Sequence, residues 1–168
     1  MKQSDEIKTI RERNLKLKLS DDDVKRISEK AGSVGMTVSE LLESFLGDLV
    51  DGTYSNGSDE RMYANSWFDR CGFSWMADNT FLKFLIDFDI VSDTVEDWNE
   101  LKWYEGNVEE LERDRRSYDD TIDRINENYS SFIEQISDQE KPKIEDEMKI
   151  VIKWWDEYLQ LQGDELPK

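Results

Sequence analysis

The chain has 168 residues and a mass of 19.9 kDa, which suits one domain or two small ones and excludes an assembly of several catalytic modules. Forty Asp and Glu against 22 Lys and Arg leave a formal net charge of -18, which opposes nonspecific binding to nucleic acid or to an anionic membrane surface. No apolar run approaches about 18 residues and the N-terminus lacks a hydrophobic signal segment, so we expect no membrane partner and a cytoplasmic location in a bacterial host cell.

The charge is unevenly distributed along the chain. Residues 1–31 hold nine basic and seven acidic residues, a net of +2, which leaves -20 for residues 32–168. We therefore expect a near-neutral head, residues 1–52, followed by an acidic helical body, residues 53–168. No linker rich in Pro, Ser or Gly separates them, so they are not expected to be independent domains.

The first predicted element is a short strand. Residues 14–19, Asn-Leu-Lys-Leu-Lys-Leu, alternate strictly between polar and apolar side chains, which is the period of a strand with one apolar face. A lone strand is not stable because its backbone groups need a partner. The partner is either a second strand of this chain, for which no clear candidate exists, or the same strand of another copy.

Two helices follow the predicted strand. Ser20 and three aspartates favour a helix start, and Gly32 ends a helix expected over about Asp21 to Ala31. Thr37 and Glu40 have the spacing of a capping box, which predicts a second helix to about Leu49. Ser58 or Asp59 can begin a third helix, and Asn79 or Thr80 a short, very apolar fourth; both are expected in the core.

The C-terminal half is predicted to form a helical hairpin. Apolar residues from Leu101 to Ile136 recur in steps of three and four, and the same steps continue from Ile144 to Tyr158. Gly106 and Asn107 favour a break near the start of the first of these helices. Pro142 suits the first turn of a last helix, so the hairpin should cover residues 93–162 and close near residues 137–142. The predicted fold is mainly α, with one short N-terminal strand, several short helices and this C-terminal antiparallel helical hairpin.

The order strand, helix, glycine-containing turn and capped helix over residues 14–50 resembles the ribbon-helix-helix family of DNA-binding repressors. The resemblance implies a homodimer in which the strands of two copies pair and their outward side chains enter the major groove. It places Asn14, Lys16 and Lys18 on the DNA side, and Thr37 where the family's second helix meets a phosphate. The acidic body is a departure from the family.

A second resemblance concerns the rest of the chain, including residues 52–65 and 67–71. This part is similar to small acidic proteins carried by phages and mobile elements of Firmicutes, a group that includes some anti-CRISPR proteins. It implies no role for any particular residue.

Catalytic and cofactor chemistry finds little support in the sequence. The chain has no histidine, so its single cysteine, Cys71, lacks the usual base that activates a thiol, and a buried core thiol is the expected role. The glycine-containing loop over residues 51–60 matches neither a phosphate-binding nor a calcium-binding loop. We expect no enzyme, no cofactor and no bound metal.

Two functional hypotheses remain. In the first, the protein is a nonenzymatic acidic inhibitor of a basic, nucleic-acid-handling protein, most concretely an anti-CRISPR protein that blocks an RNA-guided CRISPR nuclease. The second hypothesis is a dimeric ribbon-helix-helix transcriptional regulator that binds DNA through the head. For the inhibitor, the expected partner-binding residues are Glu109, Glu110, Glu112, Asp119, Asp120, Asp123 and Glu127.

Overall fold

A computed structural model describes residues 7–73, 80–136 and 141–163, and it confirms the mainly helical fold. The chain divides into two compact units, unit 1 over residues 1–75 and unit 2 over residues 76–168. The division therefore lies about twenty residues beyond the expected end of the head at residue 52. None of the described helices is long and apolar enough to cross a membrane.

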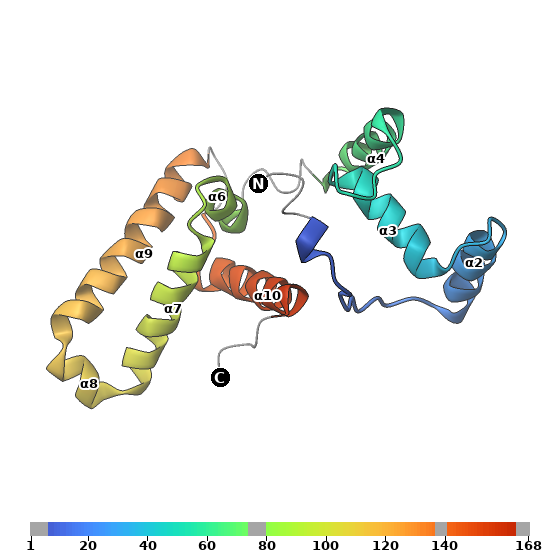
Figure 1. The fold of residues 1–168 in the computed structure, drawn as a ribbon. Helices are drawn as coiled ribbons and strands as arrows, with labels where there is room; N and C mark the ends of the chain where they lie inside the picture. Colours follow the sequence, from blue (N-terminus) through green and yellow to red (C-terminus); the bar gives the residue numbers. More distant parts are fainter. Residues whose placement is uncertain (1–6, 74–79, 137–140, 164–168) are drawn as a thin grey trace. The chain divides into compact units, whose positions relative to one another are not determined.

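Unit 1 is a series of short helices. After the single 3-10 turn η1 (Ile7–Thr9) come α2 (Asp21–Gly32), α3 (Val38–Leu49) and α4 (Ser58–Arg70), and α3 packs on both α2 and α4 (Figure 1). The predicted helix starts are confirmed for α2 and α3. The Ser20 hydroxyl accepts the backbone N–H of Asp23, and Thr37 and Glu40 form both hydrogen bonds of a capping box.

The predicted strand over residues 14–19 is not confirmed within one chain. This segment has no regular secondary structure, and the described residues contain no strand with which it could pair. Every residue from 10 to 20 is exposed. A strand is stable only in a hydrogen-bonded ladder, and the described residues offer no second strand for one. Strand pairing between two copies therefore stays a prediction.

The third helix differs from its prediction. α4 begins at Ser58 without a side-chain cap, because its N-cap residue is Gly57. It is not a core helix: Ala64 is its single buried residue, Trp67 is 46% exposed, and Cys71 is exposed rather than buried. The described part of unit 1 leaves the apolar residues at the C-terminal end of α4 only partly covered.

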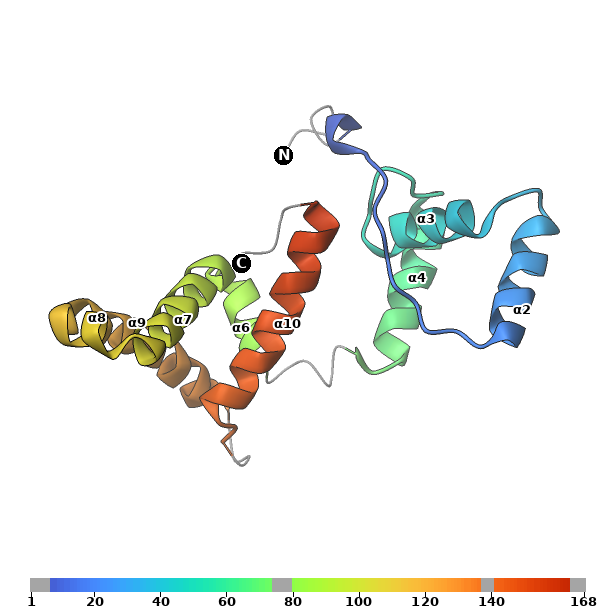
Figure 2. The same cartoon turned by 90° about the horizontal axis from the view of Figure 1, so that it is seen from below.

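Unit 2 contains five described helices, and its longest antiparallel pair packs side by side. The five are α6 (Phe81–Asp87), α7 (Val91–Gly106), α8 (Val108–Arg113), α9 (Arg115–Gln135) and α10 (Ile144–Gln162). α8 closes one end of the α7–α9 pair and α6 lies at the other end (Figure 1). α10 packs on α6 and on α7, and its place beside α6 is clear in Figure 2.

The predicted hairpin is wrong in its partners and in its closing turn. The chain turns back through α8, so α7 and α9 form the antiparallel pair, whereas α10 packs on α6 and α7 instead of along α9. The break at Asn107 agrees with the predicted break at Gly106 and Asn107, whereas a second break at Asp114 was not predicted; both residues have backbone angles outside the helical region. Residues 137–140, where the hairpin was expected to close, lie outside the described residues.

A compact core holds unit 2 together. Phe81, Leu85, Met148 and Val151 are fully buried, and Phe132 of α9 is only 2% exposed. Thr80 caps α6 by accepting the backbone N–H of Lys83, and the carboxylate of Glu147 on α10 accepts the N–H of Phe81 at 2.9 Å. The fourth predicted helix therefore lies in the core as expected.

Candidate functional site

The extended segment of unit 1 exposes three leucines in alternation. Leu15, Leu17 and Leu19 are 50%, 59% and 53% exposed, and none has the cover that a strand's apolar face normally finds. Fully burying one leucine side chain stabilises a protein by about 1.5–3 kcal/mol. Three exposed leucines at this spacing therefore form an apolar surface that the described part of the chain leaves about half uncovered.

An apolar groove lies beside these leucines. It has a volume of about 410 Å³, and Leu17 and Leu19 meet Ile27 of α2 and Val38 and Leu42 of α3 along its walls. The groove thus joins the extended segment to the two helices that follow it. Its apolar lining suits a hydrophobic segment.

The predicted DNA-contacting residues differ in their surroundings. Asn14, Lys16 and Lys18 are all exposed and accessible to a ligand. Thr37 caps α3 instead: its hydroxyl lies 2.9 Å from the Glu40 carboxylate, and its backbone N–H donates to the same carboxylate at 2.7 Å. These hydrogen bonds, the backbone one first, lower the pKa of Glu40, and the Thr37 N–H predicted to face a phosphate is already bound to the Glu40 carboxylate.

A rigid connection positions α4 after α3. The buried Asp48 carboxylate accepts the backbone N–H of Asn56 at 2.7 Å and its side-chain amide at 2.8 Å. The hydrogen bonds from Asn56, the side-chain one first, lower the pKa of Asp48. A Cβ atom on Gly47 would lie only 2.8 Å from the carbonyl carbon of Tyr54, so this close approach requires glycine.

The predicted partner-binding acids lie on α8 and α9, and some of them are paired. Glu110 forms an ion pair with Arg113, Asp119 pairs with Arg115 at 3.1 Å, and Asp120 approaches Arg116 at 3.9 Å. Four others have no ion-pair partner among the described residues: Glu109, Glu112, Asp123 and Glu127. Asp123 and Glu127 lie with Glu134 along one exposed face of α9, around a shallow hollow.

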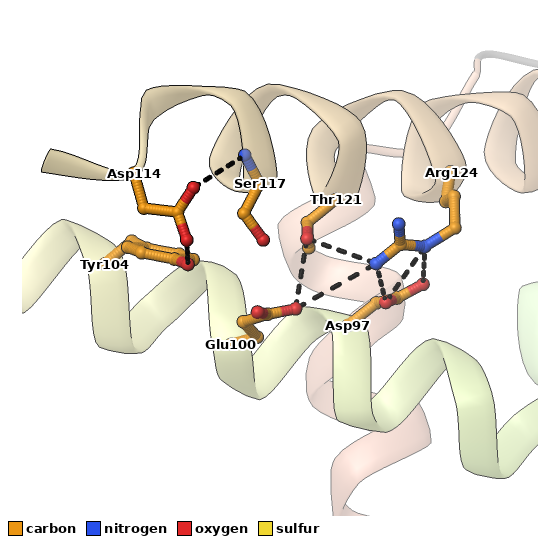
Figure 3. A network of polar contacts seen from close by, with 7 residues as sticks. All are labelled: Asp97, Glu100, Tyr104, Asp114, Ser117, Thr121 and Arg124. Carbon is orange, nitrogen blue, oxygen red and sulfur yellow. Dashed lines mark hydrogen bonds and ion pairs between the residues drawn. The ribbon is translucent and has the colours of Figure 1, made fainter. Parts of the chain in front are cut away.

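A polar network that sequence reasoning missed joins α7 to α9 (Figure 3). Arg124 of α9 binds both carboxylate oxygens of Asp97 on α7, with Nε at 3.1 and 3.0 Å from Oδ1 and Oδ2. The buried Thr121 hydroxyl donates to Glu100 at 3.0 Å and accepts from Arg124 at 3.1 Å. The hydrogen bond to Asp97 raises the pKa of Arg124. This network stabilises the α7–α9 pair.

A hydrogen bond from α9 holds the start of α10. The Tyr129 hydroxyl of α9 donates a hydrogen bond to the backbone carbonyl of Pro142, just before α10 begins. Burial, with the nearby Glu147 and Glu145, raises the pKa of Tyr129. Periodic apolar spacing predicts neither this hydrogen bond nor the Arg124 network, because both depend on which helices become neighbours.

Unit 2 also has a groove between α7 and α10. It has a volume of about 770 Å³, with Trp98, Met148 and Ile152 among its lining residues, and Lys102 lies over the Trp98 ring at 4.7 Å from the ring centroid. Three lysines and three carboxylates line it, so it favours neither charge. Within the described part of the chain, no three acidic or sulfur ligands come together as a metal site.

Comparisons with known proteins do not assign the chain to a family. No family model matches the sequence, no curated protein matches it, and no solved structure matches the fold.

Proposed function

We propose that the protein acts by binding, and that unit 1 forms a ribbon-helix-helix-type homodimer that binds DNA. The observation that carries this proposal is the row of exposed leucines, Leu15, Leu17 and Leu19, beside the apolar groove over α2 and α3. A second copy that pairs its own segment here forms a two-stranded ribbon and buries six leucines under the helices.

The same pairing determines which side chains face DNA. Side chains alternate across a strand, so leucines that face the helices leave Asn14, Lys16 and Lys18 on the opposite face. Two copies then present four lysines along one ribbon, which suits the major groove. Since Glu40 occupies the N-terminus of α3, the proposal gives Thr37 no phosphate contact.

The test combines oligomeric state with DNA affinity. Sedimentation equilibrium of the full chain should show a dimer, and Leu17→Ser should convert it to a monomer. Replacing Lys16 and Lys18 by Gln should weaken binding to a DNA duplex by about tenfold or more at fixed salt. The matched control replaces two other exposed lysines, Lys25 and Lys141, and should change the affinity much less. A monomeric wild-type chain, or equal losses from both lysine pairs, contradicts the proposal.

The second candidate is the acidic inhibitor, and the charge of unit 2 favours it. Unit 2 has 26 acidic and 11 basic residues, a net of -15, whereas unit 1 has 14 and 11, a net of -3. Concentrated negative charge attracts a basic nucleic-acid-binding protein, of which an RNA-guided CRISPR nuclease is the concrete case for an anti-CRISPR protein. The pairing of Glu110, Asp119 and Asp120 with arginines weakens this candidate, because it reduces the free negative charge.

A charge-reversal experiment tests the second candidate. DNA cleavage by a panel of RNA-guided nucleases is measured with and without the protein. Inhibition should weaken as salt rises and should be lost when Asp123 and Glu127 become Lys. The control reverses Glu96 and Glu157, which are also exposed and lie on α7 and α10. No inhibition of any nuclease, or equal effects of the two pairs, contradicts the inhibitor role.

A further inference from the structure

Unit 1 carries an exposed cluster of aromatic rings, the α4 cluster, made of Phe45, Trp67, Phe68 and Phe73. The ring centroids of Phe45 and Trp67 lie 5.5 Å apart, those of Trp67 and Phe73 5.9 Å, and those of Phe68 and Phe73 5.3 Å. The four residues are 38–46% exposed. The rings therefore contact one another while a large part of each remains uncovered.

The α4 cluster lies outside the segment that forms the ribbon. Three of its rings come from residues 67–73, at and beyond the end of α4, whereas the ribbon and its two helices end near Val50. Unit 1 offers the cluster no core, since Ala31 and Ala64 are the only buried apolar residues among its described residues. Strand pairing alone therefore leaves these four rings unexplained.

α3 joins the α4 cluster to the dimer groove. Val38 and Leu42 line the groove, and Phe45, which follows Leu42 by three residues, contacts Trp67. Residues at this spacing share one face of a helix. The groove and the cluster are thus parts of one continuous apolar surface along α3, which lies between α2 and α4 (Figure 1).

We propose that a second copy of the chain covers the α4 cluster, so that the dimer interface extends through α3 to α4. This inference rests on the proposed homodimer of unit 1. Aromatic side chains bury roughly 150–250 Å² each, so the four half-exposed rings leave on the order of 300 Å² uncovered. A stable interface needs about 800 Å² per partner. The three leucines alone fall short of that area, and the cluster supplies much of the remainder.

The test measures the dimer dissociation constant of the full chain by sedimentation. Trp67→Ala should raise this constant by at least about tenfold, as expected for a tryptophan in an interface, and Trp67→Phe should restore most of the affinity. The matched control is Trp103→Ala. Trp103 is 51% exposed and also contacts a neighbouring ring, that of Tyr104, but it lies on α7 in unit 2, so its loss should leave the constant within about twofold.

A second readout does not depend on removing an aromatic side chain. Cys71 is the chain's one cysteine, is exposed, and follows Trp67 by one helical turn. A nitroxide attached to Cys71 should be immobilised where the dimer forms and should become mobile on dilution or in Leu17→Ser. The control label is attached to the thiol introduced by Ser92→Cys in a Cys71→Ser background and should stay mobile throughout.

The outcomes separate the inference from the proposal on which it rests. A dimer that Leu17→Ser breaks, with an unchanged constant in Trp67→Ala and a mobile label at Cys71, overturns the inference and leaves the homodimer standing. A wild-type chain that is monomeric at every concentration overturns both. A weakened dimer in Trp67→Ala, rescued by Trp67→Phe, together with an immobilised label supports the extended interface.

Discussion

The two units differ in how much of their apolar surface they bury by themselves. In unit 2, Phe81, Leu85, Met148 and Val151 are completely buried. Unit 1 has a comparable supply of large apolar side chains, yet Ala31 and Ala64 are the only apolar residues buried in its described part. Apolar burial is the main favourable term in folding, so the core of unit 2 supplies more of this stabilisation than unit 1 does, and the proposed second copy would cover what unit 1 leaves exposed.

The largest expected effect breaks unit 2. Ile125 lies in the middle of α9 and is 3% exposed, so Ile125→Pro removes a helical hydrogen bond and buried aliphatic contacts. The cost should be about 3 kcal/mol or more. A circular-dichroism melt should show this loss, whereas Arg115→Pro, at the first position of α9 where proline is tolerated, should melt nearly as wild type. Equal melting of Ile125→Pro and wild type would disprove the α7–α9 pairing.

A pair of glycine substitutions tests unit 1. In Gly47→Ala, the new Cβ lies 2.8 Å from the backbone of Tyr54, which should destabilise unit 1 by about 1–3 kcal/mol. Gly32 lies at the end of α2, where an added Cβ meets no atom within 4 Å, so Gly32→Ala should stabilise the protein slightly. Chemical denaturation measures the free energy of unfolding of both variants. The same sign of change in the two variants would contradict the tight connection between α3 and α4.

The stability of unit 1 should also depend on acid pH through Asp48. The hydrogen bonds from Asn56 lower the pKa of Asp48 in the folded state below the value of about 3.9 in an unfolded chain. Their stabilisation is therefore present above about pH 4 and is lost as the pH falls through the lowered folded pKa. Asp48→Asn should be less stable at pH 7, because a neutral amide accepts these hydrogen bonds more weakly than a carboxylate, and should show a shallower acid dependence in thermal melts. Identical acid profiles of the wild type and Asp48→Asn would show that other carboxylates cause the acid dependence of stability.

The smallest effect concerns the network between α7 and α9. Thr121→Val keeps the shape of a fully buried side chain but removes the hydroxyl that links Glu100 to Arg124. We expect a loss of about 1 kcal/mol. A double-mutant cycle between Asp97 and Arg124 should give a coupling of about 1 kcal/mol or less, because half of the Arg124 side chain is exposed. A coupling several times larger would show that water is excluded from this pair.

Local chemistry explains which parts of the fold the sequence predicts. The caps at Ser20, Thr37 and Thr80 are confirmed, since a capping side chain and the amide it binds lie within three residues of each other. The hairpin prediction fails because apolar steps of three and four describe one face of a helix and contain no information about its neighbour. The chain turns back at Asn107 and Asp114, so the apolar face of α9 meets α7.

The candidate sites also divide into features that local sequence chemistry predicts and features that helix packing determines. Alternation in residues 14–19 predicts leucines on one face and Lys16 and Lys18 on the other. The segment has no regular secondary structure and both sets of side chains are exposed, so the two-faced strand stays a prediction. The pairing of Asp119 with Arg115 is an i,i+4 contact within α9, a spacing that the sequence can predict. Spacing could not predict the Arg124 network, because it joins α9 to α7 and helix packing determines which side chains meet there.

Hydrogen exchange at the backbone amides of residues 15–19 tests most directly whether a second copy completes unit 1. In a paired two-stranded ribbon every second amide of this segment donates to the partner strand, so the account predicts slow exchange at alternate residues at concentrations where the dimer forms. Protection should disappear on dilution and in Leu17→Ser. Exchange at the rate of a free chain at every concentration would contradict strand pairing and the dimer built on it.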